Sequence, residues 1–297
     1  PPPAGAQPPP AGAQPPPGEK VAVGDGPPVT AALSAEHDSL SAEHAALLCR
    51  VASRADAQQA ALLWQACDAF VGGGRWTRGQ ALERAALPGL VSEAHLVTWK
   101  AQSARLFLLV HAGETWLLDR SGGAWRVGPL QWPRRDAAAG PGHTDGLLLQ
   151  GDLVADRVGG AESEVYVYRF LAYDLLACGG RAVSTQPLHK RLALLGAEVI
   201  APRKASDTSG EKLQVRQKDC FRLKHVPYLL RKLLPELTHA HCGLVFLQSN
   251  APYGGPGSVA EWSPTSLSTD ESTAPGAEPP MTDTELVAWA ERHFSGK

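Results

Sequence analysis

The chain has 297 residues, of which 43% are hydrophobic, and this composition is ordinary for a soluble globular protein with a substantial core. Its formal net charge of -2 excludes a global basic field, so contact with nucleic acid would depend on a local cluster of Lys and Arg. The five cysteines are never spaced as C-x-x-C, and no apolar run approaches the roughly 18 residues of a membrane span, so neither a zinc ribbon nor a membrane contact is expected.

The first part of the chain is a low-complexity segment followed by a helical one. PPPAGAQ occurs twice at the start, and we expect a disordered Pro/Ala/Gly-rich linker over residues 1–30. The chain begins inside this repeat and its only methionine is Met281, so we expect a fragment or a processed form. From Ser34 to Phe70, leucines recur at helical spacing in an Ala-rich run, which predicts one long helix or two shorter ones.

Short β-like runs, separated by Gly, Ser or Asp, begin after the glycines at 72–74 and predict an antiparallel meander. They read HLVTWK, RLFLLVHA, ETWLLDR and AWRVGPL. The runs LLLQGDLVADRV, EVYVYRFLAYDLL and CGLVFLQS extend it, with the more helical PLHKRLALLGAEVIA and VPYLLRKLLPEL between them. We therefore predict an α+β fold of antiparallel sheets with flanking helices.

The end of the chain contains a second linker and a short helix. Residues 265–280 are rich in Ser, Thr and Pro, which predicts disorder. Thr282 and Glu285 are spaced as a capping box ahead of LVAWAERHF, so a short helix is expected within residues 281–297.

Lys100 ends the run HLVTWK, and a lysine in that setting is most often an exposed partner of an ion pair. Further fragments follow it in order: LLQGDLVADRV (148–158), YRFLAYDLLACGG (168–180), RLALLGAEVIAPRK (191–204), CGLVF (242–246) and EWSP (261–264). Together they resemble the motifs of eukaryotic mRNA-capping guanylyltransferases, from the lysine of K-x-D-G-x-R to the strand K-W-K-P. We accordingly place a nucleotidyltransferase domain at residues 31–264.

This resemblance implies a nucleotidyltransferase of the DNA ligase and capping-enzyme type, unrelated to ATP-grasp enzymes, which acts in mRNA 5′ capping in the nucleus. In that family a lysine amine attacks the α-phosphate of GTP and holds GMP until the 5′-diphosphate end of RNA accepts it. The amine must first lose its proton, and Mg²⁺ or Mn²⁺ offsets the phosphate charge. The implied partners are GTP, the RNA 5′ end, and RNA polymerase II or other capping components.

The resemblance also implies roles for single residues. Lys100 matches the nucleophile, and Asp152 matches a glutamate of the family and is the candidate metal ligand. The implied nucleotide contacts are Arg105, Arg120, Gly151, Asp152, Tyr173 and Trp262. The alternative for the two arginines is a surface role, and for Tyr173 a place in the core.

Several positions depart from the family pattern, and they are the charged and tight-turn ones. Gln102 and Ser103 replace Asp-Gly after the lysine, and Cys242 replaces an acidic residue, although a neutral thiol is a poor ligand for a hard cation. Glu261 and Ser263 replace two lysines. An anion near a triphosphate at low effective dielectric is repulsive by several kcal/mol, so these changes put activity in doubt.

The family closes its site with an OB-fold lid, and only 33 residues follow Pro264 here. We expect that the lid is absent, that the chain is truncated, or that another protein supplies the lid. His239, His241 and Cys242 are spaced like metal ligands, but no second pair completes a tetrahedral site. The basic stretch from Arg216 to Lys232 either faces an RNA end or is a solvated surface.

Three functions remain open on these grounds. The first is a guanylyltransferase-like enzyme that forms a GMP adduct on Lys100. The second is a catalytically inactive cap- or nucleotide-binding module on the same fold, as snurportin resembles a capping enzyme without its lid. The third is a structural partner subunit whose pocket is vestigial.

Overall fold

The computed structural model describes residues 40–72, 76, 79–136, 142, 145–160, 164–264 and 279–294. The linker expected over residues 1–30 lies outside them, as do residues 265–278 of the second linker. Every element below belongs to one compact unit, Asp38–Lys297.

The Ala-rich N-terminal run forms two helices rather than one. Ser41 and Asp56 cap them, because each side chain accepts a hydrogen bond from the backbone N–H three residues on. The second helix ends at Gly72, whose φ of 64° is the left-handed conformation that favours glycine. The elements are α1 (Ala42–Val51), β1 (Ala52–Arg54) and α2 (Ala57–Val71).

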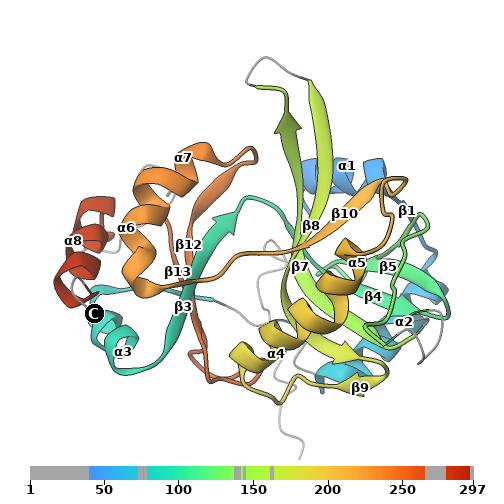
Figure 1. The fold of residues 1–297 in the computed structure, drawn as a ribbon, viewed down its shortest axis with the longest axis horizontal. Coiled ribbons are helices and arrows are strands. Elements are labelled where there is room, and N and C mark those ends of the chain that lie inside the picture. Colours follow the sequence, from blue (N-terminus) through green and yellow to red (C-terminus); the bar gives the residue numbers. More distant parts are fainter. Residues whose placement is uncertain are drawn as a thin grey trace, which may run out of the picture. The chain divides into compact units, whose positions relative to one another are not determined.

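The larger sheet runs in the order β1-β6-β5-β4-β7-β8-β10, with β9 paired to β8 (Figure 1). All of its pairs are antiparallel except β8 with β10, because a helical connection returns the chain in the same direction. The sequence analysis did not predict β10. The elements are β4 (Ala104–His111), β5 (Glu114–Leu118), β6 (Ala124–Val127), β7 (Leu147–Val158), β8 (Val165–Cys178), β9 (Arg181–Ala182), α4 (Leu188–Leu194), η3 (Leu195–Ile200), α5 (Ala201–Lys204) and β10 (Leu213–Gln217).

The smaller sheet has the order β11-β3-β12-β13-β2. The run HLVTWK forms β3 here and pairs with β11 and β12, so the prediction of one meander that begins with this run was wrong. Side-chain alternation predicts that a segment is a strand, but it does not predict the neighbouring strand with which that segment pairs. The elements are β2 (Gln80–Ala81), β3 (His95–Ala101), β11 (Phe221–Arg222), β12 (His241–Gln248) and β13 (Val259–Trp262).

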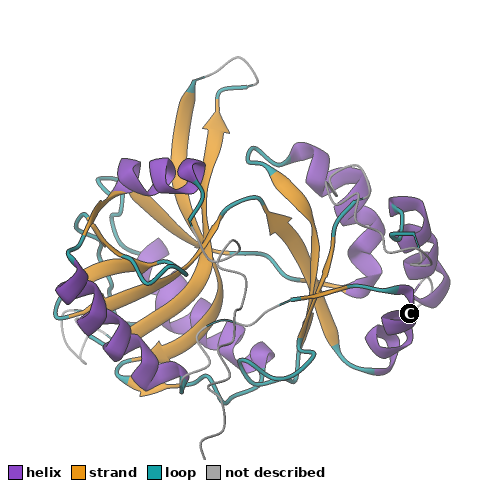
Figure 2. Cartoon of the chain, turned by 180° about the vertical axis from the view of Figure 1, so that it is seen from behind, coloured by secondary structure: helices purple, strands orange, loops and turns teal. Residues whose placement is uncertain are grey.

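Helices pack beside this smaller sheet, as Figures 1 and 2 show. The C-terminal helix α8 buries Leu286 and Trp289 in the same core cluster as Val97, Phe246 and Trp262 of the sheet. The elements are η1 (Arg84–Ala86), α3 (Leu87–Ser92), η4 (Leu223–His225), α6 (Val226–Tyr228), η5 (Leu229–Leu233), α7 (Leu234–Glu236) and α8 (Asp283–Phe294).

The two sheets share their cores. Val245 and Leu247 of β12 lie in the main cluster of the larger sheet, and Val154 and Leu171 of that sheet lie in the cluster of the smaller one. The chain passes from the smaller sheet to the larger one through the short connection between β3 and β4, at residues 102–103. Lys100 and Arg105 flank this crossing, which places both at the junction of the sheets. Within the described ranges, no helix is long and apolar enough to cross a membrane.

Candidate functional site

Lys100 lies at a bulge between β3 and β12. The pairing register shifts so that Cys242 and Gly243 of β12 lie opposite this single residue. Gly243 has a φ of 129°, and a Cβ atom there would overlap the backbone carbonyl of Trp262. Only glycine therefore fits, and the bulge fixes where the backbone presents the lysine side chain.

The Lys100 amine meets a carboxylate. Its Nζ lies 2.7 Å from Oε2 of Glu261, and Nη2 of Arg105 donates a hydrogen bond of 3.2 Å to Oε1 of the same residue. The exposed fractions of the three side chains are 28%, 17% and 23%, in the order Lys100, Glu261, Arg105. Burial acts to raise the pKa of Glu261, but the neighbouring Arg105 and Lys100 outweigh it, and the pKa lies below its ordinary value. An ionised carboxylate thus bridges two cations from β3 and β4.

A second, deeper ion pair lies beside the first. Nζ of Lys218 donates to Oδ2 of Asp152 at 2.6 Å, and both side chains are less than 10% exposed. The same ammonium lies 5.1 Å from the ring centroid of Trp99 and 5.6 Å from that of Tyr173, within the range of cation–π attraction. Lys218 belongs to the basic stretch predicted to be either solvated or facing RNA, and it is instead buried.

Tyr173 is the extra residue of a bulge between β7 and β8. Gln150 pairs with Asp174 and Gly151 pairs with Ala172, which leaves Tyr173 between two paired positions. Burial raises the pKa of its hydroxyl well above the ordinary value, so the group stays neutral. Within the described part of the chain this buried hydroxyl has no hydrogen-bond partner.

Packing within the sheet leaves no room for a side chain at Gly151. A Cβ atom at this position would lie 2.6 Å from the Phe170 ring and 2.7 Å from the carbonyl oxygen of Leu171. This supports a packing role, and a nucleotide contact at Gly151 stays a prediction. Asp174, which follows Tyr173, is bound at 2.7 Å and 2.8 Å by the buried Arg191 and has a structural role.

Arg120 contacts an aromatic stack. Its guanidinium lies 5.4 Å from the centroid of the Trp76 ring, and Trp76 stacks on Phe107 with a centroid distance of 4.3 Å. Phe107 shares one face of β4 with Arg105, because side chains alternate along a strand. A contact between Arg120 and a nucleotide stays a prediction.

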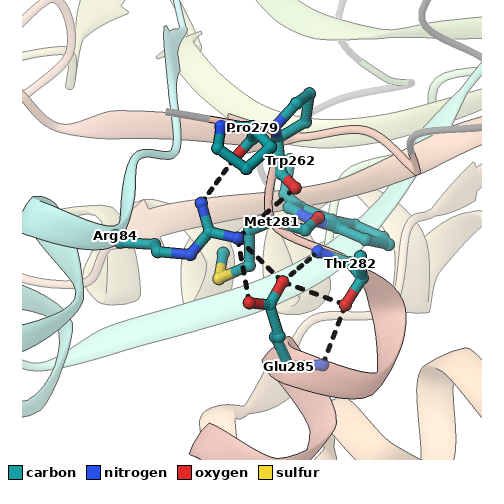
Figure 3. A network of polar contacts seen from close by, with 7 residues as sticks. Arg84, Trp262, Pro279, Met281, Thr282 and Glu285 are labelled. Carbon is teal, nitrogen blue, oxygen red and sulfur yellow. Dashed lines mark hydrogen bonds and ion pairs between the residues drawn. The ribbon is translucent and has the colours of Figure 1, made fainter. Parts of the chain in front are cut away.

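Trp262 is buried beneath the start of α8, with only 3% of its surface exposed. Its indole N–H donates a hydrogen bond of 2.9 Å to the carbonyl of Met281 (Figure 3). Arg84 holds the same segment through the Pro279 carbonyl and the Glu285 carboxylate. These contacts support a packing role for Trp262. Its role as a nucleotide contact stays a prediction.

His239 lies ahead of β12, and both of its ring nitrogens are hydrogen-bonded. Trp99 donates to Nε2 of His239 at 3.0 Å, and an indole N–H only donates, so His239 carries its proton on Nδ1 and donates it to Asp156 at 2.6 Å. In the ranges that the structure describes, no three His, Cys, Asp or Glu side chains gather as metal ligands. Burial raises the pKa of the Cys242 thiol, so it stays neutral. Asp152 is engaged by Lys218.

Two residues of this site, Trp99 and Lys218, were not predicted as site residues from the sequence. Trp99 precedes the candidate nucleophile and resembles any core aromatic in an alternating strand, and Lys218 resembles any residue of a basic surface stretch. Only the fold brings their side chains together with Asp152 and Tyr173. No local sequence signal distinguishes either residue.

The resulting site holds three cations and two carboxylates from both sheets. Lys100 and Arg105 can bind oxyanions with an amine and a guanidinium, as they bind the oxygens of Glu261. The ring of the half-buried Tyr173 lies beside the Asp152–Lys218 pair, and so does the ring of Trp99, which is buried. An arrangement of this kind suits a ligand that joins an anionic group to a flat ring.

Known proteins resemble this chain over the residues that form the site. The family described as mRNA capping enzyme, catalytic domain, matches residues 78–264. The chain is 27% identical over 197 residues to an mRNA-capping enzyme of Danio rerio, covering 63% of this chain and 32% of that protein. It is 24% identical over 195 residues to an mRNA-capping enzyme of Caenorhabditis elegans, covering 63% and 31%.

The chain therefore spans about a third of the length of these relatives. Among solved structures, a mycobacterial DNA ligase D complexed with ATP and MES aligns with a TM-score of 0.39 at 17% identity, covering 64% of this chain and 60% of that one. Because the family match extends over more than half of the sequence, the chain belongs to the mRNA capping enzyme catalytic-domain family.

Proposed function

We propose that this domain transfers GMP from GTP to the 5′-diphosphate end of RNA, through a lysyl-GMP intermediate on Lys100. The observation that carries the proposal is the convergence of Lys100 and Arg105 on one oxyanion, the carboxylate of Glu261. A phosphate presents similar oxygens to the same two donors. Family membership supports the reaction class and, with it, a place in nuclear mRNA processing beside RNA polymerase II or other capping components.

The proposed reaction has two steps. The unprotonated Lys100 amine attacks the α-phosphorus of GTP, an N–P bond forms, and the bond to the bridging oxygen breaks as pyrophosphate leaves. A terminal phosphate oxygen of the RNA then attacks the same phosphorus and releases the amine. Arg105 holds the non-bridging oxygens during both steps, while Tyr173 provides aromatic surface for the base.

Mg²⁺ or Mn²⁺ carried on the nucleotide would offset the charge of the phosphates. Magnesium is commonly held by one or two carboxylates together with substrate phosphates, and Asp152 is the candidate carboxylate. Because Asp152 is bound to Lys218, the described residues alone do not form a ready cation site.

The test is adduct formation with GTP labelled at the α-phosphate, in the presence of magnesium. We expect label that remains on the denatured protein and moves to RNA when RNA with a 5′-diphosphate end is added. Lys100→Ala should lose the label, whereas Lys232→Ala, which changes an exposed lysine, should keep it. Absence of any lysine adduct would remove the proposal.

A second candidate is a catalytically inactive module that binds guanosine nucleotides or caps. The ion pair between Glu261 and Lys100 favours it, because a paired ammonium is not a nucleophile. Titration of GTP and cap analogues in the presence of EDTA discriminates between the two. The inactive module predicts metal-independent affinity without an adduct, and lack of affinity for all of these ligands contradicts it.

A further inference from the structure

The backbone of Glu261 is fixed on both sides. It pairs with Val245 of β12 and with Ala81 of β2, and its carbonyl accepts a hydrogen bond of 2.8 Å from the N–H of Leu82. Because β13 lies between β12 and β2, the backbone of Glu261 is held on both sides and cannot move away when a ligand enters. Any change at this position has to come from the side chain.

The conformation of that side chain depends on a glycine. A Cβ atom at Gly79 would overlap Cγ, Cδ and Oε1 of Glu261, so the glutamate lies directly across the Gly79 backbone. This observation is independent of the ion pairs. It shows that the surroundings leave room for the conformation that brings the carboxylate to Lys100 and Arg105.

We infer that Glu261 determines the affinity of this site for phosphate: its carboxylate is an internal anion that holds Lys100 and Arg105 until a nucleotide displaces it. The inference rests on the proposed function for the identity of the natural ligand. Its physical content, competition between two anions for the same two donors, does not depend on GMP transfer.

Two consequences follow from that competition. A phosphate must break both contacts of Glu261 before it gains its own, so the net gain on binding is smaller than for an unoccupied pair of cations. In addition, the Lys100 amine is held 2.7 Å from the carboxylate and has to leave this contact before it can approach an electrophile. The glutamate thus reduces both phosphate affinity and amine reactivity.

Two substitutions separate the charge of Glu261 from its position. Glu261→Gln keeps the size and removes the charge, whereas Gly79→Ala keeps the charge and displaces the flexible side chain. Their matched controls are Glu236→Gln, at an exposed glutamate, and Gly89→Ala, where an added Cβ meets nothing within 4 Å. Circular dichroism establishes that each variant is folded. If Gly79→Ala does not fold, Glu261→Gln alone is sufficient for the test.

The first measurement is calorimetric titration with inorganic pyrophosphate, without metal or nucleoside. We expect both site variants to bind at least about tenfold more tightly than the unsubstituted chain, in keeping with the loss of one charged competitor. The controls should bind like the unsubstituted chain.

The second measurement is the rate at which an N-hydroxysuccinimide acetate ester modifies Lys100, determined by mass spectrometry relative to the exposed Lys232. Both site variants should accelerate modification of Lys100 several-fold. Equal pyrophosphate affinity and equal labelling in Glu261→Gln and the unsubstituted chain would overturn the inference. Failure to form a GMP adduct, with both effects present, would instead contradict only the proposed function.

Discussion

Gly243 is a single residue on which the position of the candidate nucleophile depends. Substitution by alanine combines an unfavourable φ with overlap against the Trp262 carbonyl in the adjacent strand. We expect Gly243→Ala to lower the free energy of unfolding by about 2 kcal/mol or more. Urea denaturation measures this change. Gly89→Ala serves as the control and should leave stability unchanged or slightly higher.

The buried pair of Asp152 and Lys218 gives a second prediction. Lys218→Met leaves a carboxylate buried without its partner, which should cost about 3 kcal/mol of stability. Adding Asp152→Asn removes that charge and should recover most of the loss. A double-mutant cycle by urea denaturation measures the coupling. Additive effects of the two substitutions would show that the ion pair contributes nothing specific.

At the scale of residues, Lys100 and Arg105 became candidates through the order of several motifs along the chain, and their roles toward a nucleotide stay predictions. Lys100 and Arg105 are separated by five positions, and their side chains do meet on one carboxylate. Lys218 carries no such spacing, and its burial results from the return of the chain through α4, η3 and α5. Glu261 was recognised as an unfavourable charge, but its contact with Lys100 depends on the pairing of β13 with its neighbours.

At the scale of elements, alternating runs predict the long strands well because one or both faces of each are buried. β7 spans the same residues as the run LLLQGDLVADRV. β10 was missed because LQVRQ is short and follows a polar turn, and its parallel pairing with β8 requires a crossover that no local pattern encodes. The assignment of β3 to the smaller sheet likewise depends on contacts with β11 and β12, which are far away in the sequence.

The start of α8 shows the predicted capping box. The hydroxyl of Thr282 accepts from the N–H of Glu285 at 3.3 Å, and the Glu285 carboxylate accepts from the N–H of Thr282 at 2.8 Å. The N–H of Thr282 and the guanidinium of Arg84 lower the pKa of Glu285 from 4.5 to about 2. Figure 3 shows both contacts on the one carboxylate.

This pKa shift predicts how the capping box depends on pH. A lowered pKa in the folded state stabilises the protein above the unfolded value, and the stabilisation disappears as the pH falls from about 4.5 to about 2. We expect Glu285→Gln to lower the melting temperature at pH 7 and to have a smaller effect as the pH approaches 2. A difference between the two proteins that stays constant over this range would contradict the assignment. Glu236→Gln is the control.

At the scale of the whole molecule, the shared cores join the two sheets. Each main cluster contains side chains from both sheets, and the ion pair of Arg105 with Glu261 crosses between them. We expect the described body to unfold in a single transition, in which tryptophan fluorescence and far-ultraviolet circular dichroism change at the same urea concentration. Separate midpoints for the two probes would show that the sheets unfold independently.

The central claim is that Lys100 is the residue that accepts the nucleotide. Incubation with GTP and magnesium, followed by peptide mapping with mass spectrometry, tests it most directly, and Glu261→Gln provides a more reactive parallel sample. We expect GMP on the peptide that contains Lys100, in a larger fraction of the Glu261→Gln protein than of the unsubstituted chain. GMP on a different lysine, or unmodified Lys100 in both proteins, would contradict it.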